Sequence, residues 1–293
     1  MALYAFDGTW NEDDPKNKKD TNVVWFRNAY TGPKRYWEGV GTRFSVVGKV
    51  VGGLTGAGGH DRIREALVEL TKNFLAGDRT VDIVGFSRGA AIAVDFANEV
   101  AKQTGLPGPS PATVRFLGVW DIVASFDIPG DNVDIGFDFK MPPTVQRCVH
   151  CKALDERRVF FPLTRLSGTG SNEAGRLKEV WFRGVHSDVG GGDQATGLSS
   201  IALNFMFAEA LRAGSPSDPM PLDAATVNQN AARMNPDCPI SLHPQHLLEQ
   251  LVHFRKVEQT DLVHSSVSNR QDGGGRHHNN PPAGCPKIGD DGV

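Results

Sequence analysis

The 293-residue sequence has few cysteines, no concentration of charge of one sign and no long apolar run. Four cysteines are too few for a disulfide framework in a chain of this length. The formal net charge is -3 and Lys and Arg form no long basic run, so the composition does not favour nucleic acid as a partner. The sequence thus argues against two function classes, the disulfide-rich secreted domain and the basic nucleic-acid binder.

Membrane and export signals are also missing from the sequence. No stretch approaches the roughly 18 consecutive apolar residues of a transmembrane helix. The first residues, MALYAFDGTW, lack the basic and apolar regions of a secretory signal. We therefore expect a protein that is cytoplasmic, or that is exported by a machinery that reads no N-terminal signal.

Two of the cysteines, Cys148 and Cys151, form a CxxC pattern with His150 between them. Such a pair can be a redox centre or half of a zinc site. No second pair of ligands follows at zinc-finger spacing, so we interpret the pair as structural or incidental. The sequence predicts no metal site and no cofactor.

The rest of the composition is that of a soluble globular protein, with 39% hydrophobic and 22% charged residues. We predict a single domain over 1–268 and a polar tail rich in Gly, Asp and His over 269–293, because the tail composition cannot build a core. The segments 39–59 and 126–143 are rich in glycine or aspartate and are expected to be loop insertions.

Four short apolar runs each end at a residue with useful chemistry. They are rich in Val, Ile and Phe and alternate poorly with polar residues, which is typical of strands buried on both faces of a parallel sheet. Because ligands bind outside the carboxyl ends of such strands, we expect the residues that follow them to share one site. The predicted strands are Leu3–Phe6, Val81–Phe86, Val114–Trp120 and Val180–Val185, followed by Asp7, Ser87, Asp121 and His186.

Helical patterns lie between these runs. Over 61–75 the apolar residues recur at three- and four-residue spacing, with Asp61 as the expected N-cap and Gly77 as the expected end. Two further helices are expected over 90–100 and 198–211, and the second of these is apolar nearly all round. The alternation of strand and helix predicts the α/β class, with a mainly parallel central sheet flanked by helices.

The stretch IVGFSRGAA, at 83–91, places a serine between two glycines at the end of a predicted strand. Gly85-x-Ser87-x-Gly89 matches the nucleophile elbow, in which a strained turn exposes a serine hydroxyl. The helix that follows offers the backbone N–H of Arg88 to an oxyanion. The same string also fits a plain strand-to-helix turn. The two interpretations are distinguished by whether the sequence also offers a base and an acid for the serine.

A serine nucleophile needs a base and an acid, and α/β-hydrolases supply them in the chain order Ser, acid, His. Asp121 ends the next predicted strand, and His186 ends the one after it. Each residue has a structural alternative, a helix N-cap for Asp121 and a core histidine for His186. Two competitors stay open: Asp127 as the acid, and His264 as the base.

The loop after the first predicted strand offers further polar groups. We interpret Gly8 and Thr9 as second donors to the oxyanion, and Asp7 as the residue that holds this loop by hydrogen bonds. Asp188 is expected first in a tight turn, because glycines follow it. An alternative is a metal-dependent hydrolase in which Asp7, Asp121 and Asp188 gather around a cation.

Six segments together resemble one protein family: FDGTWN (6–11), GVGT (39–42), GFSRGA (85–90), VWDIVAS (119–125), HCKALDERRVFF (150–161) and VHSDVGGG (185–192). The resemblance spans about Ala2 to Leu211. The family that they resemble is a bacterial and fungal one, the uncharacterised α/β-hydrolase domain that also forms the catalytic part of the first family of type VI secretion lipase effectors.

The resemblance implies an α/β-hydrolase fold, a Ser-Asp-His triad and, in the secreted members, phospholipase activity on bacterial membranes. Carried onto this sequence, the triad is Ser87, Asp121 and His186. The family often has alanine where Cys151 stands, which supports the incidental interpretation of the CxxC pair, with Arg157 and Arg158 as structural residues. The resemblance also implies peripheral membrane contact and an immunity or secretion-machinery partner.

The lipase effectors are usually longer than this sequence, with added segments for membrane engagement. Here the apolar flap Val46–Leu54 is the one candidate for such a contact, and a glycine-rich loop is the simpler interpretation of it. We therefore expect a serine hydrolase of carboxylic esters, acting on lipids or phospholipids. A small-ester carboxylesterase, a non-catalytic binding module and a metal-dependent hydrolase remain the alternatives.

Overall fold

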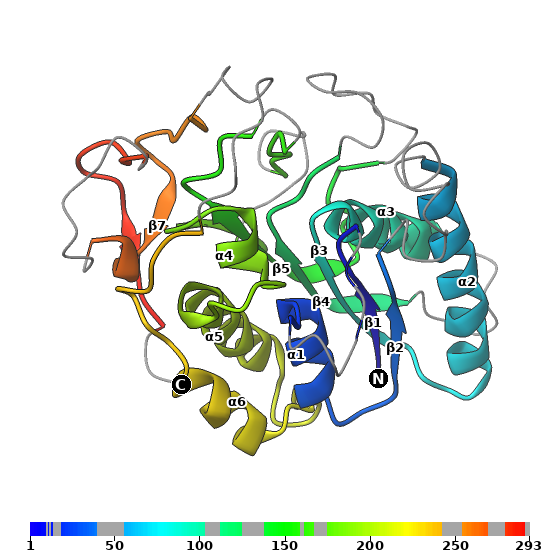
Figure 1. Ribbon diagram of the computed structural model, residues 1–293. Coiled ribbons are helices and arrows are strands. Elements are labelled where there is room, and N and C mark those ends of the chain that lie inside the picture. Colours follow the sequence, from blue (N-terminus) through cyan, green and yellow to red (C-terminus); the bar gives the residue numbers. More distant parts are fainter. Residues whose placement is uncertain are drawn as a thin grey trace.

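The computed structural model describes residues 1–9, 11, 13, 19–39, 56–102, 112–124, 138–158, 161–166, 175–241, 254–268 and 279–290. Within these residues eight parallel strands form one sheet in the order β2-β1-β3-β4-β5-β6-β7-β8 (Figure 1). The strands are β1 Ala2–Phe6, β2 Lys34–Trp37, β3 Thr80–Phe86, β4 Thr113–Trp120, β5 Val145–Ala153, β6 Leu177–Phe182, β7 Leu262–His264 and β8 Lys287–Ile288.

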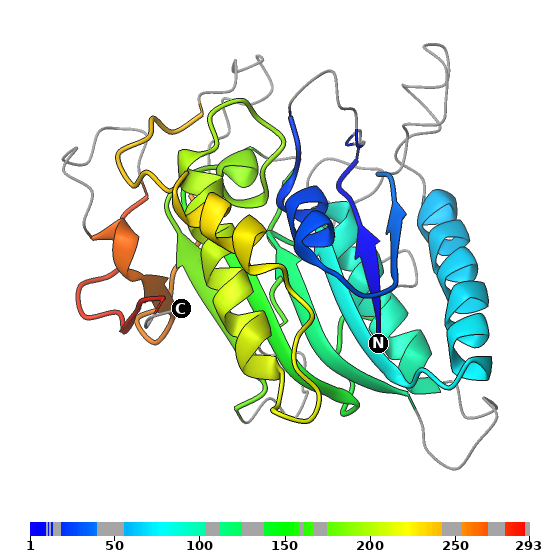
Figure 2. The ribbon, with the colours of Figure 1, turned by 90° about the horizontal axis from the view of Figure 1, so that it is seen from below.

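Helices cover both faces of the sheet. The α2 and α3 helices pack on one face, and α1, α5 and α6 pack on the other (Figure 2). The helices are α1 Asn22–Ala29, α2 Gly56–Leu75, α3 Arg88–Lys102, α4 His186–Gly190, α5 Gly197–Ala213 and α6 Ala224–Ala231, and the short 3-10 helix η2 is Ser265–Val267. In the described part of the chain no helix has both the length and the apolar character needed to cross a membrane.

The central strands β1, β3 and β4 bury side chains on both of their faces, because successive side chains point to opposite sides of a sheet. In β1, Tyr4 and Phe6 join the core under α2 and α3, while Leu3 and Ala5 join the core under α1 and α5. All four side chains are buried. This two-sided burial accounts for the unbroken apolar runs in the sequence, and the predicted α/β class is confirmed.

Three of the four predicted strands agree with the structure to within one residue, and the fourth, near His186, does not. The run Val180–Val185 was expected to be a strand that leads straight into His186, but β6 ends at Phe182 and His186 begins α4. A further strand, β5, lies between β4 and β6 in the sheet and carries both cysteines of the CxxC pair. The sequence of β5 lacks the unbroken apolar run that is typical of a buried strand, because Arg147, His150 and Lys152 interrupt it.

Helix ends test the predicted capping signals. The α2 helix begins at Gly56, so Asp61 lies inside the helix and pairs with Arg64 instead of capping it. Its other end is as predicted: Gly77 has a φ of 89°, and Asp78 N–H donates to the carbonyl of Asn73. Such a left-handed glycine closes a helix by satisfying its last carbonyls.

The strand order has a switch point between β1 and β3, where the connections diverge to opposite edges of the sheet. A crevice forms at such a point outside the carboxyl ends of the strands. The loop with Asp7 follows β1, and Ser87 follows β3. The fold thus brings together two of the loops that the sequence singled out.

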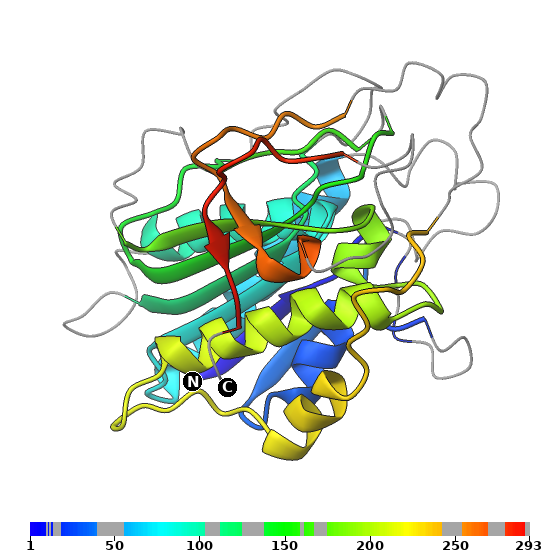
Figure 3. The same cartoon turned by 90° about the vertical axis from the view of Figure 1, so that its left-hand side faces the viewer.

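The end of the chain returns to the sheet. The β7 strand pairs with β6, and β8 pairs with β7, at the edge that faces the viewer in Figure 3. The division into a domain over 1–268 and a tail over 269–293 stays a prediction, but the described part of that tail, 279–290, contributes a strand to the sheet. The expected flap Val46–Leu54 lies outside the described residues.

Candidate active site

Ser87 lies in the one-residue step between β3 and α3, with a φ of 59°. A residue with a Cβ atom rarely adopts this left-handed conformation, so surrounding contacts must hold it. Ser87 N–H donates to the carbonyl of Trp120 at 3.0 Å, and the backbone carbonyl of Ser87 accepts from Val123 N–H at 3.3 Å. These bonds fix the strained turn that the GxSxG pattern predicts.

The two glycines of the pattern are required by close backbone approach. A Cβ atom on Gly89 would lie 2.3 Å from the carbonyl oxygen of Asp7 and 2.4 Å from that of Phe6. A Cβ atom on Gly85 would lie 2.6 Å from the carbonyl oxygen of Gly89. Any side chain at these positions would push α3 away from β1 and β3, and with it the turn that carries Ser87.

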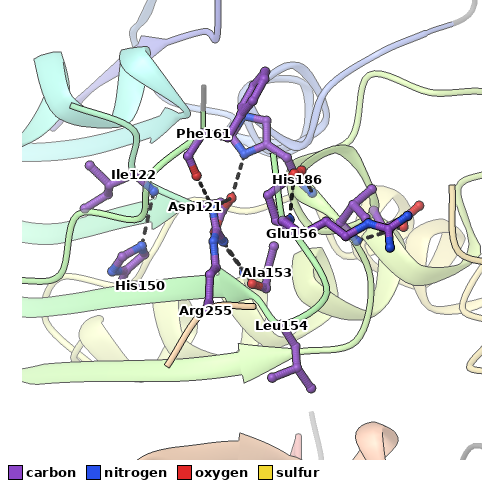
Figure 4. A network of polar contacts seen from close by, with 12 residues as sticks. Asp121, Ile122, His150, Ala153, Leu154, Glu156, Phe161, His186 and Arg255 are labelled. Atoms are coloured by element: carbon purple, nitrogen blue, oxygen red, sulfur yellow. Dashed lines mark hydrogen bonds and ion pairs between the residues drawn. The ribbon is translucent and has the colours of Figure 1, made fainter. Parts of the chain in front are cut away.

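Asp121 follows β4 at the same level as Ser87, because Phe86 and Trp120 are register partners in β3 and β4. Its φ is 44°, the second left-handed value among the described non-glycine residues. The carboxylate is fully buried and accepts a hydrogen bond from Ala153 N–H at 2.8 Å. The other oxygen lies 2.6 Å from Nδ1 of His186 (Figure 4).

His186 is the first residue of α4 and lies against two aromatic rings. The centroid of its ring lies 4.5 Å from the ring centroid of Phe86 and 4.9 Å from that of Phe161. Its backbone N–H donates to Glu156 at 3.1 Å. With Nδ1–H donating to Asp121, Nε2 carries the lone pair and can accept a proton.

Arg255 is a site residue that the sequence did not reveal. Its guanidinium meets Asp121 edge on: Nη1 lies 2.5 Å from Oδ1, and Nη2 lies 3.1 Å from Oδ2 (Figure 4). Asp121 therefore lies between a histidine and an arginine. Nothing in the segment FRKVEQ distinguishes this arginine from a surface residue, because its role arises from a contact across 134 positions of the chain.

The charges around the site set the protonation of both partners. Burial alone would raise the pKa of Asp121, but the Arg255 charge and the His186 hydrogen bond outweigh it and hold that pKa well below its usual range. Burial lowers the pKa of His186, against the opposing effect of Asp121. A carboxylate beside a neutral imidazole is the resting state that general-base catalysis requires.

A second histidine supports the backbone next to Asp121. Ile122 N–H donates to Nε2 of His150 at 3.2 Å, and Nδ1 of His150 lies 2.8 Å from Glu179. These contacts fix the residue that follows Asp121, where the chain leaves the left-handed conformation. The neighbouring cysteines take no part: Cys148 packs under α2 and α3, while Cys151 packs on the opposite face of the sheet.

The two competitors from the sequence fall elsewhere. His264 stacks on Phe182 at 4.6 Å, and its ring nitrogens contact Ser266 at 2.8 Å and Asp290 at 3.2 Å. Those partners belong to the C-terminal edge of the sheet. Asp127, the alternative acid, lies outside the described residues.

Asp7 holds the loop after β1. Its carboxylate accepts hydrogen bonds from Gly8 N–H at 2.7 Å, Tyr36 at 2.7 Å and Thr21 at 2.8 Å. Burial raises the pKa of Asp7 to about 6 in spite of these donors. The Arg88 guanidinium lies 3.5 Å from the Thr9 hydroxyl, which places the Thr9 loop beside the N-terminus of α3. The assignment of Arg88, Gly8 and Thr9 as oxyanion donors stays a prediction.

The three aspartates of the metal alternative are engaged at separate places. Asp188 accepts from Val185 N–H at 2.9 Å and from the Ser241 hydroxyl at 2.7 Å, so it caps α4 and ties down the segment at Ser241. Asp7 and Asp121 are each satisfied by the donors described above. Among the residues that the structure describes, no three His, Cys, Asp or Glu side chains are grouped to hold a metal ion.

Glu156 gives a prediction for the pH dependence of stability. Burial alone would raise its pKa, but Arg158, 2.7 Å away, outweighs burial and lowers the pKa to about 2. Since this lies below the unfolded value, the unfolded chain binds more protons, and the stabilisation is present above about pH 4.5 and lost as the pH falls toward 2. Glu156→Gln should lower the free energy of unfolding by about 3 kcal/mol at pH 7.

Urea denaturation of both proteins between pH 7 and pH 3 measures this difference, which should narrow as the pH falls. Glu99→Gln is the matched control, because Glu99 forms a partly exposed ion pair with Lys102 on α3. Such pairs contribute about 0 to 1 kcal/mol. A gap between wild type and Glu156→Gln that stays constant with pH would contradict the assignment of the charge effect to Glu156.

Comparison with known proteins places this geometry in a family. The model of the T6SS phospholipase effector Tle1-like catalytic domain matches residues 3–111 and 101–209, together more than half of the chain. No curated protein matches the chain at a significant level.

Two solved structures share the fold. An uncharacterized protein from Pseudomonas aeruginosa aligns with a TM-score of 0.60 and 22% identity, over 79% of this chain and 50% of that one. The Tle1 effector bound to the VgrG spike of the type 6 secretion system aligns with a TM-score of 0.50 and 22% identity, over 67% of this chain and 51% of that one. The chain thus spans about half the length of these proteins. On the extent of the family match, the chain belongs to the family of Tle1-like type VI secretion phospholipase effector catalytic domains.

Proposed function

We propose that the protein is a serine hydrolase that cleaves carboxylic ester bonds of lipids or phospholipids. The observation that carries this proposal is the 2.6 Å contact of Asp121 with His186, level with a serine held at a φ of 59°. An acid, a base and a serine held in a strained strand-to-helix turn suit acyl transfer in this arrangement. Membership of a phospholipase effector family supports the lipid class of the ester.

In this mechanism Nε2 of His186 accepts the hydroxyl proton of Ser87 while Oγ attacks the ester carbonyl. Asp121 stabilises the imidazolium that forms and keeps its orientation. His186 then gives the proton to the leaving alcohol, and an acyl-serine remains. Water, deprotonated by the same histidine, attacks the acyl-serine. The carboxylic acid leaves, and His186 returns the proton to Oγ of Ser87. No step requires a cofactor.

The tetrahedral oxyanion needs donors in place before the reaction. Arg88 is the first residue of α3, and its backbone N–H lies at the positive end of the helix dipole, where a negative charge is stabilised. The loop after β1 supplies the second donor in this proposal. Because Gly8 N–H already donates to Asp7, we assign this second role to Thr9.

Family membership also supports a route of export and a partner. The solved Tle1 effector is bound to a VgrG spike, and by analogy this chain would associate with a spike protein and leave the cell through a type VI secretion system. Peripheral contact with a lipid surface and an immunity protein in the producing cell belong to the same proposal.

Ser87→Ala should abolish ester hydrolysis and covalent labelling by a fluorophosphonate probe, because it removes the nucleophile and leaves the turn in place. The residual rate should lie several orders of magnitude below wild type. Ser200→Ala, which removes another buried hydroxyl on α5, is the control and should retain both activities. Wild-type turnover by Ser87→Ala would sink the assignment.

The choice of base is tested by a pair of histidine variants. His186→Ala should reduce kcat by several orders of magnitude, as the loss of a triad member does. His264→Ala should lower stability, because it leaves a cavity against Phe182, and should keep most of the activity. An inactive, folded His264→Ala beside an active His186→Ala would reverse the assignment.

Substrate class is tested with p-nitrophenyl esters of increasing acyl length, diacyl phospholipid vesicles and a peptide panel. Each buried CH₂ contributes about 0.8 kcal/mol, so an acyl-binding cleft should favour longer chains by roughly threefold or more per carbon until it is full. Fatty acid release from vesicles is expected, without peptide cleavage. Activity confined to the shortest esters would indicate a small-ester carboxylesterase.

A further inference from the structure

Arg255 comes from a part of the chain that the family match does not reach, since the match ends at residue 209. The segment that begins at Phe254 runs into β7 at the far edge of the sheet. Even so, its guanidinium lies in the site, and its side chain is only 8% exposed. A buried arginine on an active-site carboxylate calls for a role beyond surface charge.

The Arg255 guanidinium binds two residues, Asp121 and Phe161, that both contact His186. Both of its Nη groups donate to the Asp121 carboxylate, and in addition Nη1 donates to the carbonyl of Ala153 at 2.8 Å and Nη2 to that of Phe161 at 2.9 Å. Asp121 contacts Nδ1 of His186, and the Phe161 ring packs against its imidazole. One planar fork therefore fixes the two contacts that orient the base.

The backbone of Arg255 is itself tied to the site. Its carbonyl accepts from Nδ2 of Asn279 at 2.8 Å, and Asn279 N–H donates to Asp155 at 2.9 Å. Asp155 in turn accepts from Gly184 N–H, two residues before His186. The C-terminal part of the chain is thus anchored on the loops after β5 and β6, and it presents Arg255 in one position.

We propose that Arg255 is a positioning residue of the catalytic triad, which aligns Asp121 and Phe161 on His186. The proposal rests on the proposed ester hydrolysis. If Arg255 has this role, the part of the chain that the family model matches, residues 3–209, does not form an active site without the C-terminal segment.

The charge effect has a defined sign. The charged groups that act on the imidazole are Asp121 after β4 and Glu156 and Arg158 after β5. Arg255 from the C-terminal segment pairs with Asp121, and Arg88 of α3 lies next to Phe161. The Arg255 cation offsets the Asp121 carboxylate and thereby disfavours a second cation on His186. Without it, the imidazolium is better stabilised, and the base becomes neutral only at higher pH.

Arg255→Met and Arg255→Lys separate charge from geometry, because Met removes both and Lys keeps the charge without the fork. The matched controls are Arg115→Met and Arg115→Lys. Arg115 also forms a buried two-pronged ion pair, with Asp82, but near the start of β4 and therefore at the opposite end of the strand from Asp121. The measurements are the pH profile of kcat/KM for a p-nitrophenyl ester, kcat itself and the thermal unfolding temperature.

For Arg255→Met we expect the acid limb of the profile to move to higher pH by about one unit, with kcat reduced on the order of tenfold to a hundredfold. For Arg255→Lys we expect a similar loss in kcat with the limb close to its wild-type position. Both Arg115 variants should lower the unfolding temperature and leave the limb and kcat unchanged. If Arg255→Met does not fold, the kcat of folded Arg255→Lys decides.

Two results would overturn the proposal in different ways. An active wild type whose Arg255 variants unfold at lower temperature but keep the wild-type limb and kcat would show that Arg255 is merely structural, with ester hydrolysis intact. A wild type without Ser87-dependent hydrolysis would remove the proposed function and, with it, the role of Arg255.

Discussion

The arrangement of the site depends on one buried carboxylate. Asp121 has no solvent access, so its charge has to be compensated by donors within the protein. His186, Arg255 and Ala153 N–H provide those donors from three different parts of the chain. An unpaired buried charge is costly, so the two carboxylate oxygens of Asp121 hold all three parts of the chain in place. The compensation of the charge is therefore also the assembly of the site.

A second constraint is backbone strain at neighbouring strand ends. Ser87 and Asp121 both have positive φ values, and they follow the register partners Phe86 and Trp120. A residue with a Cβ atom keeps this left-handed conformation only where the surrounding structure holds it. The bond from Ser87 N–H to Trp120 links the two strained turns. The tightly packed parallel sheet supplies the rigidity that keeps both of them.

Much of this could be predicted from local patterns. Buried parallel strands have unbroken apolar runs, so β1, β3 and β4 were recognisable, and GxSxG marked the turn at Ser87. The β5 strand was not recognisable, because polar residues such as His150 and Lys152 are buried in it through partners that lie far away in sequence. The helix at His186 escaped prediction as well, since five residues are too few to show helical periodicity.

The sequence by itself determined the fold class, the family and the identity of Ser87, Asp121 and His186 as candidates, because these follow from short-range patterns at the ends of apolar runs. Only the tertiary structure decided that Asp121 faces His186 and that Arg255 completes the pair. Neither contact has a local signature. Which ionisable groups meet in a buried site depends on strand order and on where the last segment of the chain packs, and long-range burial determines both.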